Sequence, residues 1–148
     1  MADRCRVRVA TEADLGGIVA IEQEVFSDPW PRESFHRLLS QLALVADDGD
    51  EVAGYILAHW AGEESEILNL AVHPERRRRG IGRRLVEDAV VRLAANGVRL
   101  VFLDVRASNE GARAFYDGLG FRQMGRHPGY YHRPREDALI MARTLALH

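Results

Sequence analysis

Residues 66–105 constrain the fold more than any other part of the chain. EILNLAV (66–72) and VRLVFLDV (98–105) have the apolar composition of buried strands. Between them, IGRRLVEDAVVRLAAN (81–96) has apolar residues at helical spacing and ends before Gly97. Two strands joined through a helix lie parallel in one sheet. The segment therefore predicts a parallel strand–helix–strand unit.

The flanking segments predict antiparallel strands and further helices. CRVRVA (5–10) alternates like a half-buried strand, and LALVA (42–46), DDGDE (47–51) and VAGYILAHW (52–60) read as a hairpin. FRQMGR (121–126) and DALIMARTL (137–145) read as a closing pair joined by a loop over residues 127–136. Helices are expected at 11–25, 32–39 and about 109–118. The result is an α+β fold with a mixed, mostly antiparallel sheet of about seven strands and about four helices.

Composition narrows the functions that such a fold can serve. A chain of 148 residues with 47% hydrophobic and 28% charged residues is typical of one globular domain, which we expect to span residues 1–148. The net charge of −2 argues against direct nucleic-acid binding. All 20 basic residues are arginine, which excludes the lysine of a Walker loop.

The cysteine and histidine content indicates the compartment and argues against a metal. Cys5 is the single cysteine, so no intramolecular disulfide can form, which fits a reducing environment. No apolar stretch resembles a signal peptide or approaches the ~18 residues of a membrane span. The six histidines show no spacing typical of metal ligands. We therefore expect a cytoplasmic protein with no metal and no membrane contact.

The loop between the two parallel strands carries RRRRGIG at residues 76–82. The N–H groups in the first turn of a helix have no partner within the helix, and the helix dipole adds partial positive charge there. Gly80 and Gly82 lack side chains, so a phosphate group can approach the backbone closely. A solvated basic turn is the alternative, because the glycine spacing matches neither the Walker loop nor the dinucleotide fingerprint.

Sequence blocks across nearly the whole chain point to a known family. RRRRGIG resembles the Q/R-x-x-G-x-G/A acetyl-coenzyme A signature of the Gcn5-related N-acetyltransferases. LNLAV, LDVRASNEGARAFYDGLGF and REDALIM, together with DPW and GYY, are similar to the bacterial ribosomal-protein-alanine N-acetyltransferases. The resemblance implies a single acetyltransferase domain in which the central parallel strands splay apart.

The resemblance also implies which residues bind acetyl-coenzyme A. In the family, the pantetheine arm enters between the splayed strands and pairs with the edge of the first, where an N–H near Leu70 would stabilise the thioester oxyanion. The arginine–glycine loop would hold the pyrophosphate. Asn109 matches an asparagine that contacts the pantetheine arm, although it could simply cap a helix. The implied set is Leu70, Ala71, Val72, Arg77, Arg78, Arg79, Gly80, Ile81, Gly82 and Asn109.

Two catalytic residues are implied in the same way. Tyr116 matches the general acid that protonates the coenzyme A thiolate, and its alternative is a tyrosine packed into the core. Asp104 matches the general base, which is a glutamate in the family, so the shorter aspartate predicts proton transfer through water. Otherwise Asp104 only ends a strand or pairs with Arg106, and Glu66 on the neighbouring strand acts as the base through water.

The acceptor groove is expected to contain aromatic residues. Trp30 matches the family's Pro-Trp pair, and Tyr130 and Tyr131 lie in the expected last hairpin loop, although each could serve only in packing. The resemblance implies acetyl transfer to the N-terminal α-amine of a protein, in particular the N-terminal alanine of a small-subunit ribosomal protein. A small-amine acetyltransferase for a polyamine or aminoglycoside is the alternative enzyme. A non-catalytic acyl-coenzyme A binding module is a third possibility.

Overall fold

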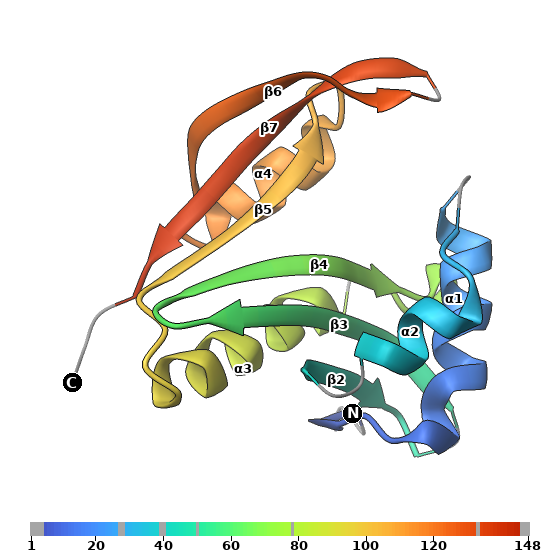
Figure 1. Ribbon diagram of the computed structural model, residues 1–148. Coiled ribbons are helices and arrows are strands. Elements are labelled where there is room, and N and C mark those ends of the chain that lie inside the picture. The colour runs from blue at the N-terminus through green and yellow to red at the C-terminus, as the bar shows by residue number, and fades with distance from the viewer. Residues whose placement is uncertain are drawn as a thin grey trace.

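The computed structural model places its described residues in one mixed sheet with helices on both faces (Figure 1). No helix in this part of the chain is both long and apolar enough to cross a membrane. The described residues are 5–26, 29–38, 41–49, 51–77, 79–132 and 134–145. The strands are β1 (Arg6–Val9), β2 (Leu42–Asp47), β3 (Val52–Ala61), β4 (Glu64–Val72), β5 (Leu100–Arg106), β6 (Arg122–His132) and β7 (Arg135–Thr144). The helices are α1 (Leu15–Val25), α2 (Arg32–Leu38), α3 (Ile81–Ala95) and α4 (Glu110–Gly118), with 3₁₀ turns η1 (Glu12–Asp14) and η2 (Pro74–Arg76).

The sheet consists of two antiparallel halves joined by one short parallel ladder. The strand order is β1-β2-β3-β4-β5-β7-β6, and only β4 and β5 are parallel. Their ladder pairs residues 64–66 with residues 100–102, and beyond it the two strands diverge (Figure 1). Within the described chain, residues 67–72 therefore have no strand on their β5 side. The predicted α+β fold with a splayed central parallel pair is confirmed.

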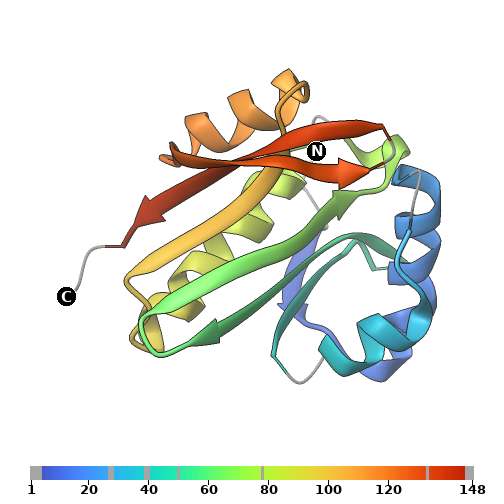
Figure 2. The same cartoon turned by 45° about the horizontal axis from the view of Figure 1, so that its top comes forward.

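Two apolar clusters lie on opposite faces of the sheet. Helices α3 and α4 cover one face with residues such as Leu85 and Tyr116, whereas α1 and α2 cover the other with Ile18 and Phe35. Figure 2 shows α1 and α2 beside the β2–β4 part, and α4 beside the β5–β7 part. The half of the sheet formed by β5, β7 and β6 thus has its helix on the α3 side.

Strand alternation and one bulge determine which side chains face α1. In β5, Val101 and Leu103 are buried under α3 and α4, so Asp104 points to the opposite face. In β4, Leu57 pairs with Asn69 but Ala58 pairs with Ile67, which leaves residue 68 as an extra residue. The bulge changes the alternation between residues 66 and 69, so that both of these side chains share the α1 face.

The last hairpin differs from the prediction. We expected a loop over residues 127–136, but β6 runs to His132 and β7 begins at Arg135. Residues 128–130 oppose the single Asp137, whose carboxylate accepts the Gly129 N–H at 2.8 Å. Pro128 is tolerated because β6 is the edge strand, where its missing N–H disrupts no ladder. Tyr130 and Tyr131 therefore lie on a bulged strand and not in a loop.

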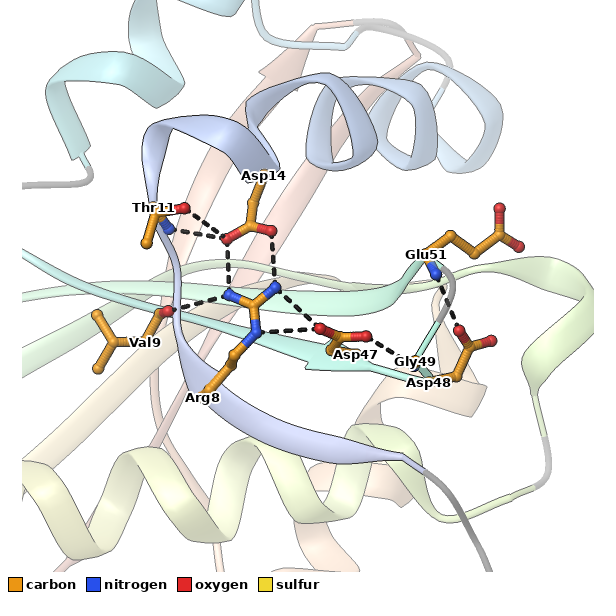
Figure 3. A network of polar contacts seen from close by, with 8 residues as sticks. All are labelled: Arg8, Val9, Thr11, Asp14, Asp47, Asp48, Gly49 and Glu51. Atoms are coloured by element: carbon orange, nitrogen blue, oxygen red, sulfur yellow. Dashed lines mark hydrogen bonds and ion pairs between the residues drawn. The ribbon is translucent and has the colours of Figure 1, made fainter.

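Arg8 ties the first strand to η1 and β2 (Figure 3). Its guanidinium donates two hydrogen bonds of 2.9 Å to Asp14 and bonds of 3.0 and 3.1 Å to Asp47. Asp14 is 7% exposed and also accepts the Thr11 N–H at 2.8 Å. The hydrogen bonds from Arg8 hold the pKa of Asp14 below its ordinary value. The pKa of Asp47 is also lowered, mainly by the hydrogen bond from the Gly49 N–H and secondly by the hydrogen bond from Arg8.

We predict that Arg8→Met lowers the free energy of unfolding by about 2 kcal/mol at pH 7, because Asp14 would lose a paired charge while remaining buried. A carboxyl with a depressed folded pKa stabilises the fold above its unfolded pKa of ~3.9 and loses that contribution as the pH falls through the folded value. Urea unfolding should therefore show a difference that shrinks below about pH 4.

The matched control for Arg8→Met is Arg99→Met. Arg99 pairs with Glu63 at 2.9 Å, and both side chains are more than half exposed. An exposed pair of this kind contributes about 0–1 kcal/mol. Equal losses in the two variants, or a loss in Arg8→Met that does not change with pH, would contradict a structural role of the Arg8 network.

Candidate active site

The described part of the loop from β4 to α3 presents backbone donors at the start of α3. Gly80 adopts a φ of +74°, a left-handed conformation that favours glycine, and it precedes α3 without a side-chain cap. The first N–H of α3 to bond back is that of Arg84, which reaches the Gly80 carbonyl at 3.0 Å. No hydrogen bond from the N–H groups of residues 81–83 to another described residue is present, so these groups are candidates to hold an anion.

Gly82 lies where the chain leaves little room for a side chain. A Cβ atom there would lie 3.3 Å from Phe115 Cζ on α4 and 3.7 Å from Val72 Cγ2 at the end of β4. The first turn of α3, the end of β4 and α4 therefore meet at this glycine. A phosphate at the start of α3 would be close to the open edge of β4.

The arginines of the run have different environments. Arg76 is bound to the β2–β3 turn through Asp48 and through Glu51, the latter at 2.6 Å. Arg77 donates to the Val72 carbonyl at 3.4 Å, and the side chain of Arg79 is exposed. Arg78 lies outside the described residues. Arg76 therefore supports the fold, whereas Arg77 and Arg79 are placed beside the N-terminus of α3.

The edge of β4 facing β5 is the second part of the site. Ala71 is buried against the α1 side, and Leu70 and Val72 pack partly against the α3 cluster. Because the parallel ladder stops at Glu66, the backbone of this segment faces the space between the diverging strands. The bulge at residue 68 lies directly before it and changes the direction in which its N–H groups point.

The two α4 residues predicted to face the cofactor occupy different environments. Asn109 is exposed and caps α4, its Oδ1 accepting the Ala112 N–H at 3.0 Å. Tyr116 is 8% exposed and packs edge-on against Phe115 and Phe121, with ring centroids 5.0 and 5.5 Å away. Burial raises the pKa of Tyr116 above its ordinary value, so its hydroxyl keeps its proton at physiological pH. Asn109 thus caps a helix and Tyr116 packs into the core, as their alternative interpretations expected. Contact with a cofactor stays a prediction for both residues.

Asp104 lies in the middle of β5, where it pairs with Ile140 of β7. The strand continues to Arg106, so the interpretation that Asp104 ends its strand is wrong. Arg106 pairs with Glu136 at 3.3 Å, and its guanidinium lies 4.2 Å from the centre of the Tyr131 ring. Burial raises the pKa of Asp104, and the nearby His127 partly opposes this rise.

Glu66 lies on the same face, at the last pair of the ladder that joins β4 to β5. Its Oε1 is 3.3 Å from His59 Nε2 on β3. Burial raises the pKa of Tyr130, and the negative charges of Asp104 and Glu66 raise it further. Glu66 pairs with Phe102 of β5, and Asp104 lies two residues further along that strand, so both carboxylates project from the same face. The structure therefore places the two candidate bases on neighbouring strands and on one face of the sheet.

Aromatic side chains lie on the same face of the sheet as these carboxylates. The rings of His127 and Tyr130 stack with centroids 5.4 Å apart, and Tyr130 meets Tyr131 edge-on at 5.1 Å. Tyr130 remains 50% exposed. Trp30 packs on Phe35 of α2 at 5.7 Å, between α1 and α2. The same face of the sheet thus carries the predicted acceptor residues and the candidate bases.

Two residues of this face were not predicted from the sequence. His127 lies in the segment that was expected to be a loop, and no sequence spacing indicated a functional residue there. Glu22 of α1 is only 1% exposed and lies under the helix with Tyr55 and Asn69. A usable signal existed for Glu22, because it follows Ile18 by four residues and so continues the apolar face of α1.

Comparisons with known proteins agree with this arrangement. The model of the Acetyltransferase (GNAT) family matches residues 15–121. A ribosomal protein bS18-alanine N-acetyltransferase from Salmonella typhimurium is 34% identical over 148 residues, covering 95% of this chain and 98% of the relative.

Solved structures show the same fold. The ribosomal-protein-S18-alanine N-acetyltransferase from Escherichia coli superposes with a TM-score of 0.90 at 30% identity, covering 97% of this chain and 96% of that one. Arabidopsis thaliana NAA60, solved in complex with acetyl-CoA, has a TM-score of 0.85 at 22% identity and covers 95% and 99% of the two chains. With the splayed parallel pair and the loop before α3, these matches show that the chain belongs to the Acetyltransferase (GNAT) family.

Proposed function

We propose that this enzyme transfers the acetyl group of acetyl-coenzyme A to the α-amine of a protein N-terminus, and that its acceptor is the N-terminal alanine of a small-subunit ribosomal protein. The observation that carries the proposal is the divergence of β4 and β5, with a phosphate-binding type of loop on one side and carboxylates with tyrosines on the other. The names of the Salmonella and Escherichia coli relatives support the choice of acceptor. Such an acceptor would be met in the cytoplasm.

The described residues fit acetyl-coenzyme A. The N–H groups at the start of α3 and the side chains of Arg77 and Arg79 would hold the pyrophosphate, since backbone donors and arginines both suit phosphate oxygens. The open edge of β4 at residues 70–72 would pair with the amides of the pantetheine arm. When bound, the thioester supplies an activated acetyl group, and an N–H near Leu70 would stabilise negative charge on its oxygen.

Asp104 would accept the proton of the attacking amine through a water molecule. Burial raises its pKa, so the carboxylate is a somewhat stronger base than an exposed aspartate. Glu66 shares the same face but is bonded to His59. We therefore assign the main role to Asp104 and a supporting electrostatic role to Glu66.

Tyr116 would donate a hydrogen bond to the departing sulfur. A thiol has an ordinary pKa of ~8.5, so it leaves readily as a thiolate. Because burial raises the pKa of Tyr116 further above that value, complete proton transfer to the thiolate is unfavourable. A hydrogen bond that strengthens as charge develops on the sulfur is the larger contribution.

The acceptor groove would be formed by Trp30, Tyr130 and Tyr131. A half-exposed tyrosine beside two carboxylates suits an amine that arrives as an ammonium ion at the end of an extended peptide. A small polyamine would use the same carboxylates but would gain little from the aromatic residues.

We predict that mass spectrometry will detect acetylation of a peptide with N-terminal alanine taken from a small-subunit ribosomal protein. The mass should increase by one acetyl group at the α-amine. The same peptide with a blocked terminus and an internal lysine serves as the control and should remain unmodified. Acetylation of spermidine or an aminoglycoside without any peptide product would favour the small-amine enzyme, and binding of acetyl-coenzyme A without any product would favour a non-catalytic module.

We predict that Asp104→Asn lowers kcat/KM by about 10²-fold at pH 7, because the base is lost. The deficit should shrink towards pH 9, since an α-ammonium with a pKa of ~7.7–8.0 deprotonates there without help. The pH dependence of the variant thus shifts upward, while Asp104→Glu should equal or exceed the parent enzyme. Glu66→Gln is the matched control, and full activity of Asp104→Asn with an inactive Glu66→Gln would assign the base to Glu66.

We predict that Tyr116→Phe lowers kcat by about 10²-fold and leaves the Kd of coenzyme A nearly unchanged. No described residue hydrogen-bonds the Tyr116 hydroxyl, so its removal should hardly affect the melting temperature. Tyr55→Phe removes a buried hydroxyl that is bonded to Glu22 and should show the opposite pattern, a lower melting temperature with kcat preserved. A Tyr116→Phe enzyme with the parent kcat would mean that the thiolate leaves unaided.

A further inference from the structure

A fully buried carboxylate lies between α1 and the sheet, close to the site. Glu22 is 1% exposed, and its Oε1 accepts hydrogen bonds from the Tyr55 hydroxyl and from Asn69 Nδ2, the latter at 2.6 Å. Its Oε2 accepts the Trp30 N–H at 3.0 Å. One carboxylate thus joins three parts of the fold. These are β3 through Tyr55, the open-edged strand β4 through Asn69, and the connection from α1 to α2 through Trp30.

The hydrogen bonds fix the orientation of the Asn69 amide. Glu22 Oε1 accepts the hydrogen bond from Nδ2, so the NH₂ group of Asn69 faces Glu22. The same Nδ2 also donates a longer hydrogen bond of 3.4 Å to the Tyr55 hydroxyl. Burial and the adjacent Glu22 raise the pKa of Tyr55, so this hydroxyl stays a donor to the carboxylate. The oxygen of the amide, Oδ1, therefore points away from Glu22.

Asn69 Oδ1 has no hydrogen-bond donor within the described part of the chain. No fully buried side-chain oxygen or nitrogen of these residues lacks a partner, so Oδ1 is not fully buried. Its acceptor capacity is open to solvent or to a bound molecule. An oriented carbonyl oxygen at a half-buried position is a ready acceptor for an N–H group.

The position of Asn69 relates this oxygen to the reacting groups. The residue directly precedes Leu70, on the open edge of β4, and follows the bulge at residue 68. Its side chain points to the face of the sheet that carries Glu66 and Asp104. An amine that attacks a thioester at the edge of β4 from this face would pass the Asn69 side chain.

We propose that Asn69 is a substrate-contacting residue, whose Oδ1 accepts a hydrogen bond from an N–H of the attacking amine, and that Glu22 is the positioning residue that keeps this oxygen turned toward the amine. The inference rests on the proposed acetyl transfer. A hydrogen bond from the amine to a fixed oxygen restrains its rotation and helps to direct its lone pair at the thioester carbon.

The test compares three variants on the best acceptor of the parent enzyme. Asn69→Ala removes the oxygen, and Glu22→Gln keeps the shape but allows the new amide to donate to Oδ1 and turn the Asn69 amide. Both should lower kcat/KM for the acceptor by about 10-fold or more, as for loss of one hydrogen bond, with the KM for acetyl-coenzyme A unchanged. Tyr55→Phe is the matched control. It removes a donor from the same carboxylate and the longer hydrogen bond of 3.4 Å from Asn69 Nδ2, but it keeps the 2.6 Å hydrogen bond to Glu22 that orients the Asn69 amide.

The outcomes separate this inference from the proposed function. If Tyr55→Phe melts at a lower temperature but keeps kcat/KM while Asn69→Ala and Glu22→Gln lose it, the inference stands. Parent-like kcat/KM in Asn69→Ala, or losses of equal size in Tyr55→Phe and Glu22→Gln, would show that the cluster only supports the fold. If the parent enzyme acetylates a small amine and no peptide, the proposed acceptor is wrong, but the same three comparisons on that amine still decide the role of Asn69.

Discussion

The rest of the site depends on how short the parallel ladder between β4 and β5 is. Three pairs of residues, 64–66 with 100–102, hold the two halves of the sheet together, and the strands separate beyond them. A longer ladder would satisfy the backbone of residues 67–72 within the sheet. Because it stops, an inner strand exposes an edge in the middle of the molecule, where edges are normally paired. The bulge at residue 68 lies at the point of divergence and sets the direction of that edge.

The divergence also divides the chemistry between the two faces of the sheet. The side with α3 and α4 provides the backbone donors at the start of α3 and the buried Tyr116, which suit a phosphate-bearing thioester. The other side provides Asp104, Glu66 and the tyrosines of β6, which suit an amine. Under the proposed function, the two substrates approach from opposite faces and meet only at the edge of β4. This geometry allows direct transfer without a covalent enzyme intermediate.

Periodicity predicted the secondary structure well wherever one face of an element is buried. The strand–helix–strand unit over residues 66–105, the end of α3 before Gly97 and the hairpin of β2 and β3 all follow the expected pattern. The last hairpin did not, because Pro128 and Gly129 indicate a loop in the sequence, whereas an edge strand with a bulge accommodates both. The sequence cannot reveal that a carboxylate such as Asp137 takes up the unpaired N–H there.

The candidate site was predictable from the family resemblance and much less from the residues alone. The resemblance assigned Asp104, Tyr116 and the loop, and their roles stay predictions. It did not reveal His127 beside Asp104 or the buried Glu22 that orients Asn69. A glutamate is rarely buried without a paired charge, so its ordinary interpretation on a helix is an exposed position. Only the three donors around Glu22 in the folded chain, from Tyr55, Asn69 and Trp30, make that burial possible.

The strength of the base bears on the kind of amine that the site can use. A lysine side chain has an ordinary pKa of ~10.4, so a free amine is scarce at neutral pH and a strong, close base is required. An α-ammonium at ~7.7–8.0 is already partly deprotonated. Asp104 is one methylene shorter than a glutamate, and although burial raises its pKa, His127 opposes the rise. If Asp104 acts as the proposed base, its reach and strength are adequate for an α-amine and poor for a lysine. The missing methylene at position 104 therefore supports a protein N-terminus as the acceptor, independently of the names of the relatives.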